Sequence, residues 1–347
     1  MRTSLLLACL TLFPSFGAIA APQDAKADAP KVHKIAVGGE GGWDYLSVDT
    51  DARRLYVSRG DRVVVFDLDT EKVVGELANT PGVHGVAVAP EFGKGFTSNG
   101  RDGTVTVFDL KTLKPTGTLK ASGVPDFIVY DPVSKRVFTL NHSTNDATAI
   151  DAETAKVVGT MDCGGEPEAA IADGNGHIFV NVRSKSEIAE FDAKTLKVLN
   201  RYPLAPGVRP NGLAFDPKTR RLFSTCGNKK MVVMDADKGT IVDAVDIGAG
   251  SDGAMFDPGN GLAYSSNGGD GTVTIVGAAA GGKYKVVANV ATQAGARTMT
   301  LDPKTHRLYF SAASPLPAPA VAAGQPQAKG GRRGYAPGSF VIVVVGD

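Results

Sequence analysis

YLSVDTDARRLYVSRGDRVVVFDLDTEKVVGEL, at residues 45–77, contains four short runs rich in β-branched and aromatic residues. The runs are Tyr45–Asp49, Leu55–Ser58, Arg62–Leu68 and Lys72–Leu77. Polar turn residues, Asp and Gly among them, separate the runs, and this composition is typical of β-strands joined by tight turns. The segment therefore predicts four short antiparallel strands.

The same unit recurs along the chain. The turn that follows the first run falls at seven positions, spaced 40 to 45 residues apart: Asp49, Ala89, Asp131, Asp173, Asp216, Asp257 and Asp302. The aspartate that ends the third run gives a second set of anchors with a similar spacing: Asp67, Asp109, Asp151, Asp192 and Asp235. Four strands in a repeat of this length are the signature of a β-propeller. We therefore predict an all-β, seven-bladed β-propeller with four-stranded blades.

The ends of the repeat region predict how the ring closes. The seventh copy supplies only three runs, Thr298–Leu301, Leu308–Ser311 and Phe340–Val345. An additional run, Val32–Val37, precedes the first copy. We expect this N-terminal strand to complete the last blade, because an unpaired edge would invite aggregation. Residues 312–338, rich in Pro, Ala and Gly, interrupt that blade and predict a loose surface loop.

The residues before the repeats resemble a targeting signal. Arg2 and an apolar stretch lead to Ala-Ile-Ala at 18–20, which predicts a signal peptide at 1–21. Residues 22–31 then form a polar, flexible leader, and 32–347 form a single propeller domain. We therefore expect a periplasmic or secreted protein without a membrane span.

Charge and cysteine content argue against two classes of protein. Of the 37 basic residues, Arg2 lies in the expected signal peptide, which leaves 36 against 36 acidic residues. A balanced chain has no strong attraction to nucleic acid or acidic lipid. Cys163 and Cys226 are the two cysteines left, and we expect free, packed thiols rather than a disulfide scaffold. We expect the protein to be a monomer.

Four segments carry a family resemblance: RLYVSRGDRVVVFDLDTEKVVG, NGRDGTVTVFDLKTLK, GLAFDPKTRRLFST and PGSFVIVVVGD. With them the chain resembles the YVTN/YncE family of bacterial seven-bladed propellers over residues 32–347. The YVTN tetrapeptide itself is replaced by LYVS, GFTSN and AYSSN. The resemblance implies a periplasmic or secreted propeller and no particular chemistry, because functions in this family are mixed.

A polar position recurs five residues before each first anchor. In a propeller the innermost strands begin at one end of the central channel, so these residues converge on one channel mouth. We predict that they form a ligand-binding site: Asp44, His84, Asp126, Glu168, Asn211, Asp252 and Arg297. Solvation or structural pairing of the same residues is the alternative interpretation.

The hairpins between the second and third strands return to this mouth. Their basic residues form a candidate rim for an anionic ligand: Arg59, Arg101, His142, Arg183, Lys185, Lys229 and Lys230. Ordinary solvated turns are the other interpretation. The rim lacks the interleaved aromatic residues on which bases stack, so we do not expect nucleic acid as a partner.

The carboxylates at the mouth also suggest a metal. Glu168, Asn211 and Asp252 offer oxygen ligands of the kind preferred by Ca²⁺ or Mg²⁺. Crowding predicts raised carboxyl pKa values at this mouth unless a cation or Arg297 offsets the repulsion. A carboxyl titrating near neutral pH would then be available as a base for hydrolysis.

A second, local resemblance bears on catalysis. RPNGLAF at 209–215 is similar to a segment of the gluconolactonase/regucalcin propellers, and Ser251-Asp252-Gly253 is similar to their later D-G motif. That resemblance implies that Asn211 and Asp252 bind a catalytic metal, with Asp44 in the place of that family's Glu. Those propellers have six blades. We therefore predict a binding or interaction scaffold for a small-molecule or protein ligand, with a metal-dependent lactonase or related hydrolase as the alternative.

Overall fold

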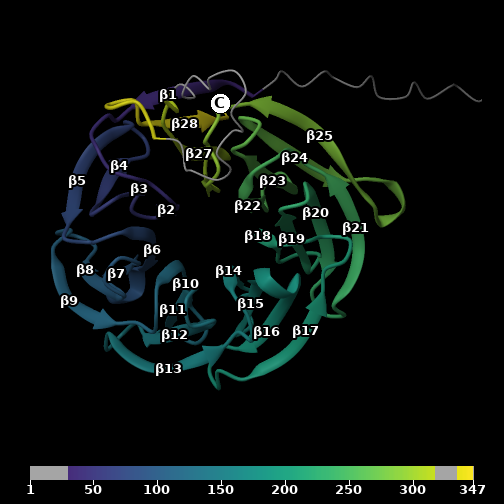
Figure 1. Cartoon of the computed structure of the whole chain (residues 1–347), viewed down its shortest axis with the longest axis horizontal. Helices are drawn as coiled ribbons and strands as arrows, with labels where there is room; N and C mark the ends of the chain where they lie inside the picture. Colours follow the sequence, from purple (N-terminus) through teal and green to yellow (C-terminus); the bar gives the residue numbers. More distant parts are fainter. Residues whose placement is uncertain (1–29, 317–333, 347) are drawn as a thin grey trace, which may run out of the picture.

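The computed structural model describes residues 30–316 and 334–346, which form seven antiparallel four-stranded sheets around a central channel (Figure 1). This arrangement confirms the predicted seven-bladed propeller. In blade 1 the strands run outward from the channel as β2 (Leu46–Asp49), β3 (Arg54–Arg59), β4 (Arg62–Asp67) and β5 (Lys72–Ala78). These bounds agree with the four predicted runs to within one residue at each end.

Blades 2 to 6 repeat the same order. Blades 2 and 3 contain β6 (Val83–Ala89), β7 (Lys94–Asn99), β8 (Thr104–Asp109), β9 (Pro115–Lys120), β10 (Pro125–Asp131), β11 (Arg136–Asn141), β12 (Asp146–Asp151) and β13 (Lys156–Asp162). Blade 4 contains β14 (Pro167–Ala172), β15 (His177–Val182), β16 (Glu187–Asp192) and β17 (Val198–Pro203). Blades 5 and 6 contain β18 (Pro210–Asp216), β19 (Arg221–Cys226), β20 (Lys230–Asp235), β21 (Thr240–Asp246), β22 (Ser251–Asp257), β23 (Leu262–Asn267), β24 (Thr272–Ala278) and β25 (Tyr284–Ala291). Short 3₁₀ turns occur at Pro90–Phe92, Arg183–Lys185 and Ala280–Gly282.

Blade 7 is built from both ends of the described chain. Its order is β26 (Met299–Asp302), β27 (Arg307–Ala312), β28 (Val341–Val345) and β1 (Val32–Ala36). The register of β1 against β28 is antiparallel, which confirms the predicted closure by the N-terminal strand. The predicted signal peptide and most of the leader lie outside the described residues, as do 317–333 of the predicted loop.

A buried arginine locks the segment that leads from β1 into blade 1. The Arg59 guanidinium lies 3.8 Å from the centre of the Phe340 ring, close enough for a cation–π contact. It also donates hydrogen bonds to five successive backbone carbonyls, those of residues 38–42. Burial lowers the pKa of this side chain to about 10. Arg59 is therefore a structural residue, and its assignment to the basic rim was wrong.

The apolar core lies between neighbouring blades. Phe138 and Leu140 of blade 3 pack with Ile178 and Val180 of blade 4, and similar clusters fill the other junctions. This follows from strand geometry, because alternate side chains point to opposite faces of each blade and every blade has a neighbour on both faces. Cys163 and Cys226 are buried free thiols in two different clusters, as predicted.

The turns at the end of the channel opposite the mouth hold the blades together. In three of them a buried aspartate pairs with a basic residue of the next blade, and we call these pairs the interblade clasps: Arg53–Asp302 at 2.8 Å, Arg220–Asp173 at 2.9 Å and His306–Asp257 at 2.7 Å. Each basic residue adopts a left-handed backbone, with φ between 54° and 60°. Such a backbone costs about 1–2 kcal/mol for an ordinary residue, and the ion pair helps to offset that cost.

Candidate functional site

Six of the seven predicted mouth residues line one cavity of about 670 Å³. They are Asp44, His84, Asp126, Glu168, Asp252 and Arg297. The hairpins add Arg101, His142 and Arg183, so strand starts and hairpins do share one mouth. Asn211 is not among the described residues that line the cavity.

Local irregularities aim several of these side chains into the channel. The register between the first two strands shifts within 83–85, 125–128, 167–170, 210–213 and 251–253. Each interval contains one predicted site residue. A bulge bends its strand and redirects a side chain, and bulges are common beside binding sites. The same position is therefore both polar and backbone-irregular in five successive blades.

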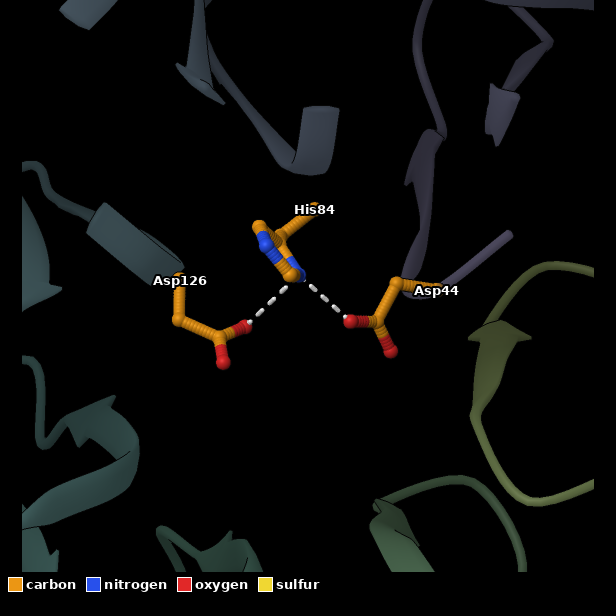
Figure 2. Close-up of side chains that lie close together, drawn as sticks. All are labelled: Asp44, His84 and Asp126. Atoms are coloured by element: carbon orange, nitrogen blue, oxygen red, sulfur yellow. Dashed lines mark hydrogen bonds and ion pairs between the residues drawn. The ribbon is translucent and has the colours of Figure 1, made fainter. Parts of the chain in front are cut away.

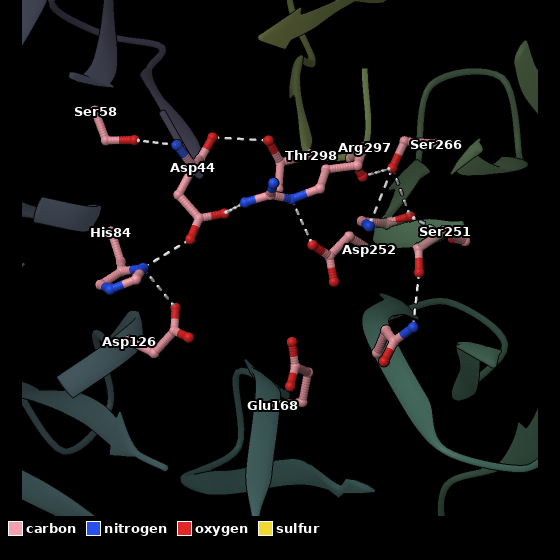
Figure 3. A network of polar contacts seen from close by, with 12 residues as sticks. Asp44, Ser58, His84, Asp126, Glu168, Ser251, Asp252, Ser266, Arg297 and Thr298 are labelled. Atoms are coloured by element: carbon pink, nitrogen blue, oxygen red, sulfur yellow. Dashed lines mark hydrogen bonds and ion pairs between the residues drawn. The ribbon is translucent and has the colours of Figure 1, made fainter. Parts of the chain in front are cut away.

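Asp44 occupies the centre of the polar network (Figure 3). Arg297 Nη2 donates to Asp44 Oδ1 at 2.9 Å, and Arg297 Nε donates to Asp252 Oδ2 at 2.8 Å. On its other side, Asp44 Oδ2 lies 2.7 Å from His84 Nδ1. The Asp44 backbone is fixed as well, because its N–H donates to Ser58 Oγ and its carbonyl accepts from Thr298 Oγ1.

The contacts continue around the channel through two histidines. His84 Nδ1 also lies 3.3 Å from Asp126 Oδ1, and His142 Nδ1 lies 3.4 Å from Asp126 Oδ2. His142 Nε2 then lies 3.5 Å from Glu168 Oε2, which accepts a hydrogen bond from Arg183 Nη1. Acidic and basic groups alternate, and we call the eight residues the mouth ring: Asp252, Arg297, Asp44, His84, Asp126, His142, Glu168 and Arg183.

Burial and pairing drive the carboxyl pKa values in the mouth ring apart. Burial and the charge of Asp44 raise the pKa of Asp126 to about 6. Burial and the charge of Asp252 raise the pKa of Glu168 to about 8, although Arg183 acts in the opposite direction. Burial also raises the pKa of Asp252, against the effect of Arg297. Burial acts to raise the pKa of Asp44 too, but His84 and Arg297 outweigh it and leave that pKa lowered.

His84 and Tyr45 respond to the same carboxylates. Burial lowers the pKa of His84, but the Asp44 hydrogen bond and the Asp126 charge outweigh it and leave the pKa raised. Burial and four surrounding carboxylates raise the pKa of the Tyr45 hydroxyl well above its usual value. The Tyr45 hydroxyl therefore stays neutral, and Tyr45 lines the cavity with the mouth ring.

Three buried polar atoms in the mouth ring lack a hydrogen-bond partner: Asp126 Oδ1, His142 Nε2 and Arg183 Nε. The closest contact of Asp126 Oδ1 in the ring is His84 Nδ1, whose single hydrogen is directed to the nearer Asp44. Buried polar groups normally have a partner, so an atom without one is a place where a ligand gains a bond.

His142 and Arg183 were assigned to the basic rim, not to the ligand site, and a repeat signal could have placed them. Both follow the last residue of the second strand of their blade. At this position the described sequence has glycine in four other blades: Gly60, Gly100, Gly227 and Gly268. A basic side chain at a position where four other blades have glycine is a difference that the sequence alone could have shown. Lys185, Lys229 and Lys230 of the predicted rim do not line the cavity.

The cation site predicted from Glu168, Asn211 and Asp252 stays a prediction. Asn211 lies in the buried strand β18, where its Nδ2 donates to the Ser251 carbonyl at 2.7 Å and its Oδ1 has no hydrogen-bond partner. Glu168 and Asp252 each already have a guanidinium partner. The local charge that would attract Ca²⁺ or Mg²⁺ is therefore largely neutralised at these two carboxylates.

Two other groups in the described chain bring candidate metal-ligand atoms close together. One comprises Asp44, His84 and Asp126 (Figure 2), and the other His142, Glu166 and Glu168. Within each group the candidate ligand atoms all lie within 4.8 Å of one another. Both groups belong to the mouth or border it, so any ion held there would face the cavity.

Fold and site together define a seven-bladed propeller with a charged, hollow channel mouth. The chain is similar to a solved structure of Kuenenia stuttgartiensis hydrazine synthase, with 17% identity, a TM-score of 0.69, and coverage of 85% of this chain and 96% of that one. The chain is also similar to a chain in the crystal structure of the mitotic checkpoint complex, with 16% identity, a TM-score of 0.70, and coverage of 88% of this chain and 96% of that one. These likenesses show the fold alone. No family model and no curated protein matches the sequence. In the described residues, no helix is long and apolar enough to cross a membrane.

Proposed function

We propose that this propeller is a binding protein that takes a small hydrophilic ligand into the channel mouth. One observation carries the proposal: a ring of alternating acidic and basic side chains lines a cavity of about 670 Å³. Small-molecule sites usually occupy about 300–1,000 Å³. The β-propeller fold commonly serves as an interaction scaffold, and the cavity adds a place where a small ligand would be held.

The chemistry of the lining supports a ligand with groups of both kinds. Asp126 Oδ1 lacks a hydrogen-bond partner and would accept from an amine or hydroxyl of the ligand. Arg297 and Arg183 line the same cavity and would pair with a carboxylate. A zwitterionic or hydroxylated acid therefore fits better than an apolar molecule, which would leave these charges desolvated.

A thermal-shift panel of amino acids, hydroxy acids, polyamines and sugars, run with EDTA present, tests this function. A ligand at about 100 times its Kd stabilises the folded state by about 2.7 kcal/mol. We expect one class to raise the melting temperature of the parent and of Asp51→Asn, an exposed control, but not of Asp252→Asn. A panel without any shift, or a shift kept in Asp252→Asn, would contradict the proposal.

A hydrolase at the same mouth, including a lactonase, is the second candidate function. It is favoured by two carboxyl groups whose pKa values of about 6 and 8 bracket neutral pH, because such groups exchange protons efficiently at that pH. Turnover of a lactone panel by the parent, lost in Glu168→Gln and kept in Asp51→Asn, would establish it. Absence of turnover with and without added divalent metals would exclude lactone hydrolysis.

We also propose that the protein acts in the periplasm or is secreted. The support is the sequence of residues 1–21, with its basic start, apolar stretch and Ala-Ile-Ala motif. Mass spectrometry of the protein from its native host should find a mature N-terminus just after Ala20 or Ala21. An intact N-terminus in the cytoplasmic fraction would refute this localisation.

A further inference from the structure

We propose that Asp44, His84 and Asp126 bind one divalent transition-metal ion whose open coordination positions face the cavity. The inference rests on the proposed function, because the ion would lie in the same channel mouth and would contact the bound ligand. It differs from the sequence prediction in both the ligands and the class of metal.

The three side chains already meet almost as ligands do. His84 Nδ1 lies 2.7 Å from Asp44 Oδ2 and 3.3 Å from Asp126 Oδ1 (Figure 2). Ligand atoms bound at about 2.0–2.2 Å in a tetrahedral site stand roughly 3.0–3.5 Å from one another. A metal would therefore require small side-chain adjustments, with no movement of the strands.

A second observation favours a cation between these groups. Asp126 Oδ1 is buried and has no hydrogen-bond donor, and it contacts the same His84 nitrogen, Nδ1, as the Asp44 carboxylate. Neutral His84 has one ring hydrogen, so it cannot donate from Nδ1 to both aspartates at once. A metal ion bound through Nδ1 would contact Asp44 and Asp126 together and satisfy both.

The neighbouring residues leave the ligand atoms of this group free. Arg297 binds Asp44 through Oδ1, so Oδ2 still faces His84 and the ion. In the other candidate group, Arg183 binds Glu168 through Oε2, the same oxygen that faces His142. Arg297 therefore orients Asp44 as an outer-shell partner would, whereas Arg183 competes for the ligand atom of Glu168.

The ligand types select the class of metal. One imidazole nitrogen and two carboxylates suit Zn²⁺, Co²⁺, Ni²⁺ or Mn²⁺ better than Ca²⁺, which takes six to eight oxygen ligands. Three protein ligands leave at least one position for water or for a ligand in the cavity. That open position is where a carboxylate or hydroxyl of the proposed organic ligand would bind.

Titration of the full chain with Co²⁺ tests the site, after EDTA treatment and removal of the chelator. Calorimetry should find one equivalent bound, and the visible spectrum should show absorption typical of a low-coordinate N/O site. His84→Gln and Asp126→Asn should each weaken binding by roughly tenfold or more. Glu166→Gln, in the other candidate group, and His33→Gln, an exposed histidine remote from the mouth, should leave binding unchanged.

Several outcomes would overturn the assignment. They are no binding of Co²⁺, Zn²⁺ or Mn²⁺ to the parent, undiminished binding by folded His84→Gln and Asp126→Asn, or loss in Glu166→Gln or His33→Gln instead. Circular dichroism shows whether each variant has folded. If either His84→Gln or Asp126→Asn does not fold, metal binding by the other variant decides the assignment. The panel with EDTA separates the two proposals, because an organic ligand that binds without metal leaves the proposed function standing when the metal site fails. Conversely, if the protein binds metal but no organic ligand shifts its melting temperature, whether metal is present or absent, the metal site stands and the proposed function fails.

Discussion

The two ends of the central channel both carry buried aspartates, but they use them differently. At the turn end, Asp302 accepts the Lys304 N–H, the Thr305 hydroxyl and the Arg53 guanidinium. At the mouth, Asp126 has only histidine contacts at 3.3 and 3.4 Å, and one of its oxygens has no hydrogen-bond donor. The pKa of Asp302 is lowered, although burial opposes the shift, whereas burial raises the pKa of Asp126 to about 6.

The difference teaches how one repeat serves two purposes. At the turn end, a backbone N–H that is fixed by the fold helps to hold the Asp302 carboxylate in its ionised form. The basic partners at the mouth come from the same blade or from a neighbouring one, and two of them, His84 and His142, are histidines, the residue type whose charge changes near neutral pH. The interblade clasps therefore stabilise the ring, while the mouth ring keeps groups that a ligand or proton can still change.

The largest expected effect is at the turn end, in Asp302→Ala. This substitution removes a fully buried carboxylate and leaves Arg53 without one of its two aspartates. Breaking a buried ion pair costs about 3–5 kcal/mol, so we expect a loss of about 3 kcal/mol in urea unfolding. Lys135→Met is the control. Lys135 has the same place in its blade as Arg53, but the preceding blade has Ala89 in place of the turn aspartate, and Lys135 contacts the Phe92 ring instead. A loss below about 1 kcal/mol in Asp302→Ala would show that the clasp is not stabilising.

A smaller loss is expected at the mouth, in Asp44→Asn. Because the folded pKa of Asp44 is lowered, its ionisation stabilises the protein above the unfolded pKa, and the contribution disappears as pH falls through the folded pKa. We expect about 1–2 kcal/mol at neutral pH, and no difference from the parent in strong acid. Urea unfolding across this pH range, with Asp51→Asn as control, measures it. An equal loss at every pH would point to packing instead of charge.

The opposite sign is expected for Glu168→Gln. A pKa raised to about 8 means that the folded state keeps a proton that the unfolded chain has lost, so parent stability falls as pH rises from about 4.3 to about 8. The variant removes this cost, and above that range we expect it to be more stable than the parent by about 1 kcal/mol. Melting temperatures against pH give the comparison. A variant that is less stable than the parent at high pH would mean that the Arg183 pair outweighs burial.

The smallest effect on stability is expected for Gly100→Ala. A Cβ at this position would lie 2.6 Å from His84 Nε2 and 3.3 Å from the Pro125 backbone oxygen, so the imidazole must move and β10 must yield by a few tenths of an ångström. We expect a stability change within about 1 kcal/mol and a His84 pKa that returns toward 6.5 as the Asp44 contact is lost. Titration followed by NMR measures this pKa. Gly117→Ala, where nothing lies within 4 Å of the added Cβ, is the control, and an unshifted His84 pKa would contradict the expectation.

The sequence predicted the ring well because strand periodicity and turn residues report directly on the backbone. The anchors at Asp49 and Asp67 sit at the ends of β2 and β4, and the missing fourth run of the last copy correctly indicated a composite blade. Repetition made these signals strong, since an error in one copy would have been exposed by the others.

Side-chain reach was harder to predict from the same repeat. Arg59 is the last residue of β3, one position before the glycine that aligns with His142 and Arg183, and it turns inward and binds backbone carbonyls. Asn211 aligns with the site residues, but it does not line the cavity, and its amide nitrogen donates to the Ser251 carbonyl of the next blade. Alignment specifies where a Cα lies. The partner of a long polar side chain depends on neighbouring blades, which are distant in sequence.

The pairing of β1 with β28 also dictates the order in which the molecule can be completed. Val345 pairs with Val32, so the seam stays open until nearly the entire chain has been synthesised. Until then the apolar face of blade 1 that packs on blade 7 is uncovered, and such surfaces are prone to aggregation. Non-local pairing of this kind is also slow. We therefore expect the pairing of the first and last strands to be a late step of folding.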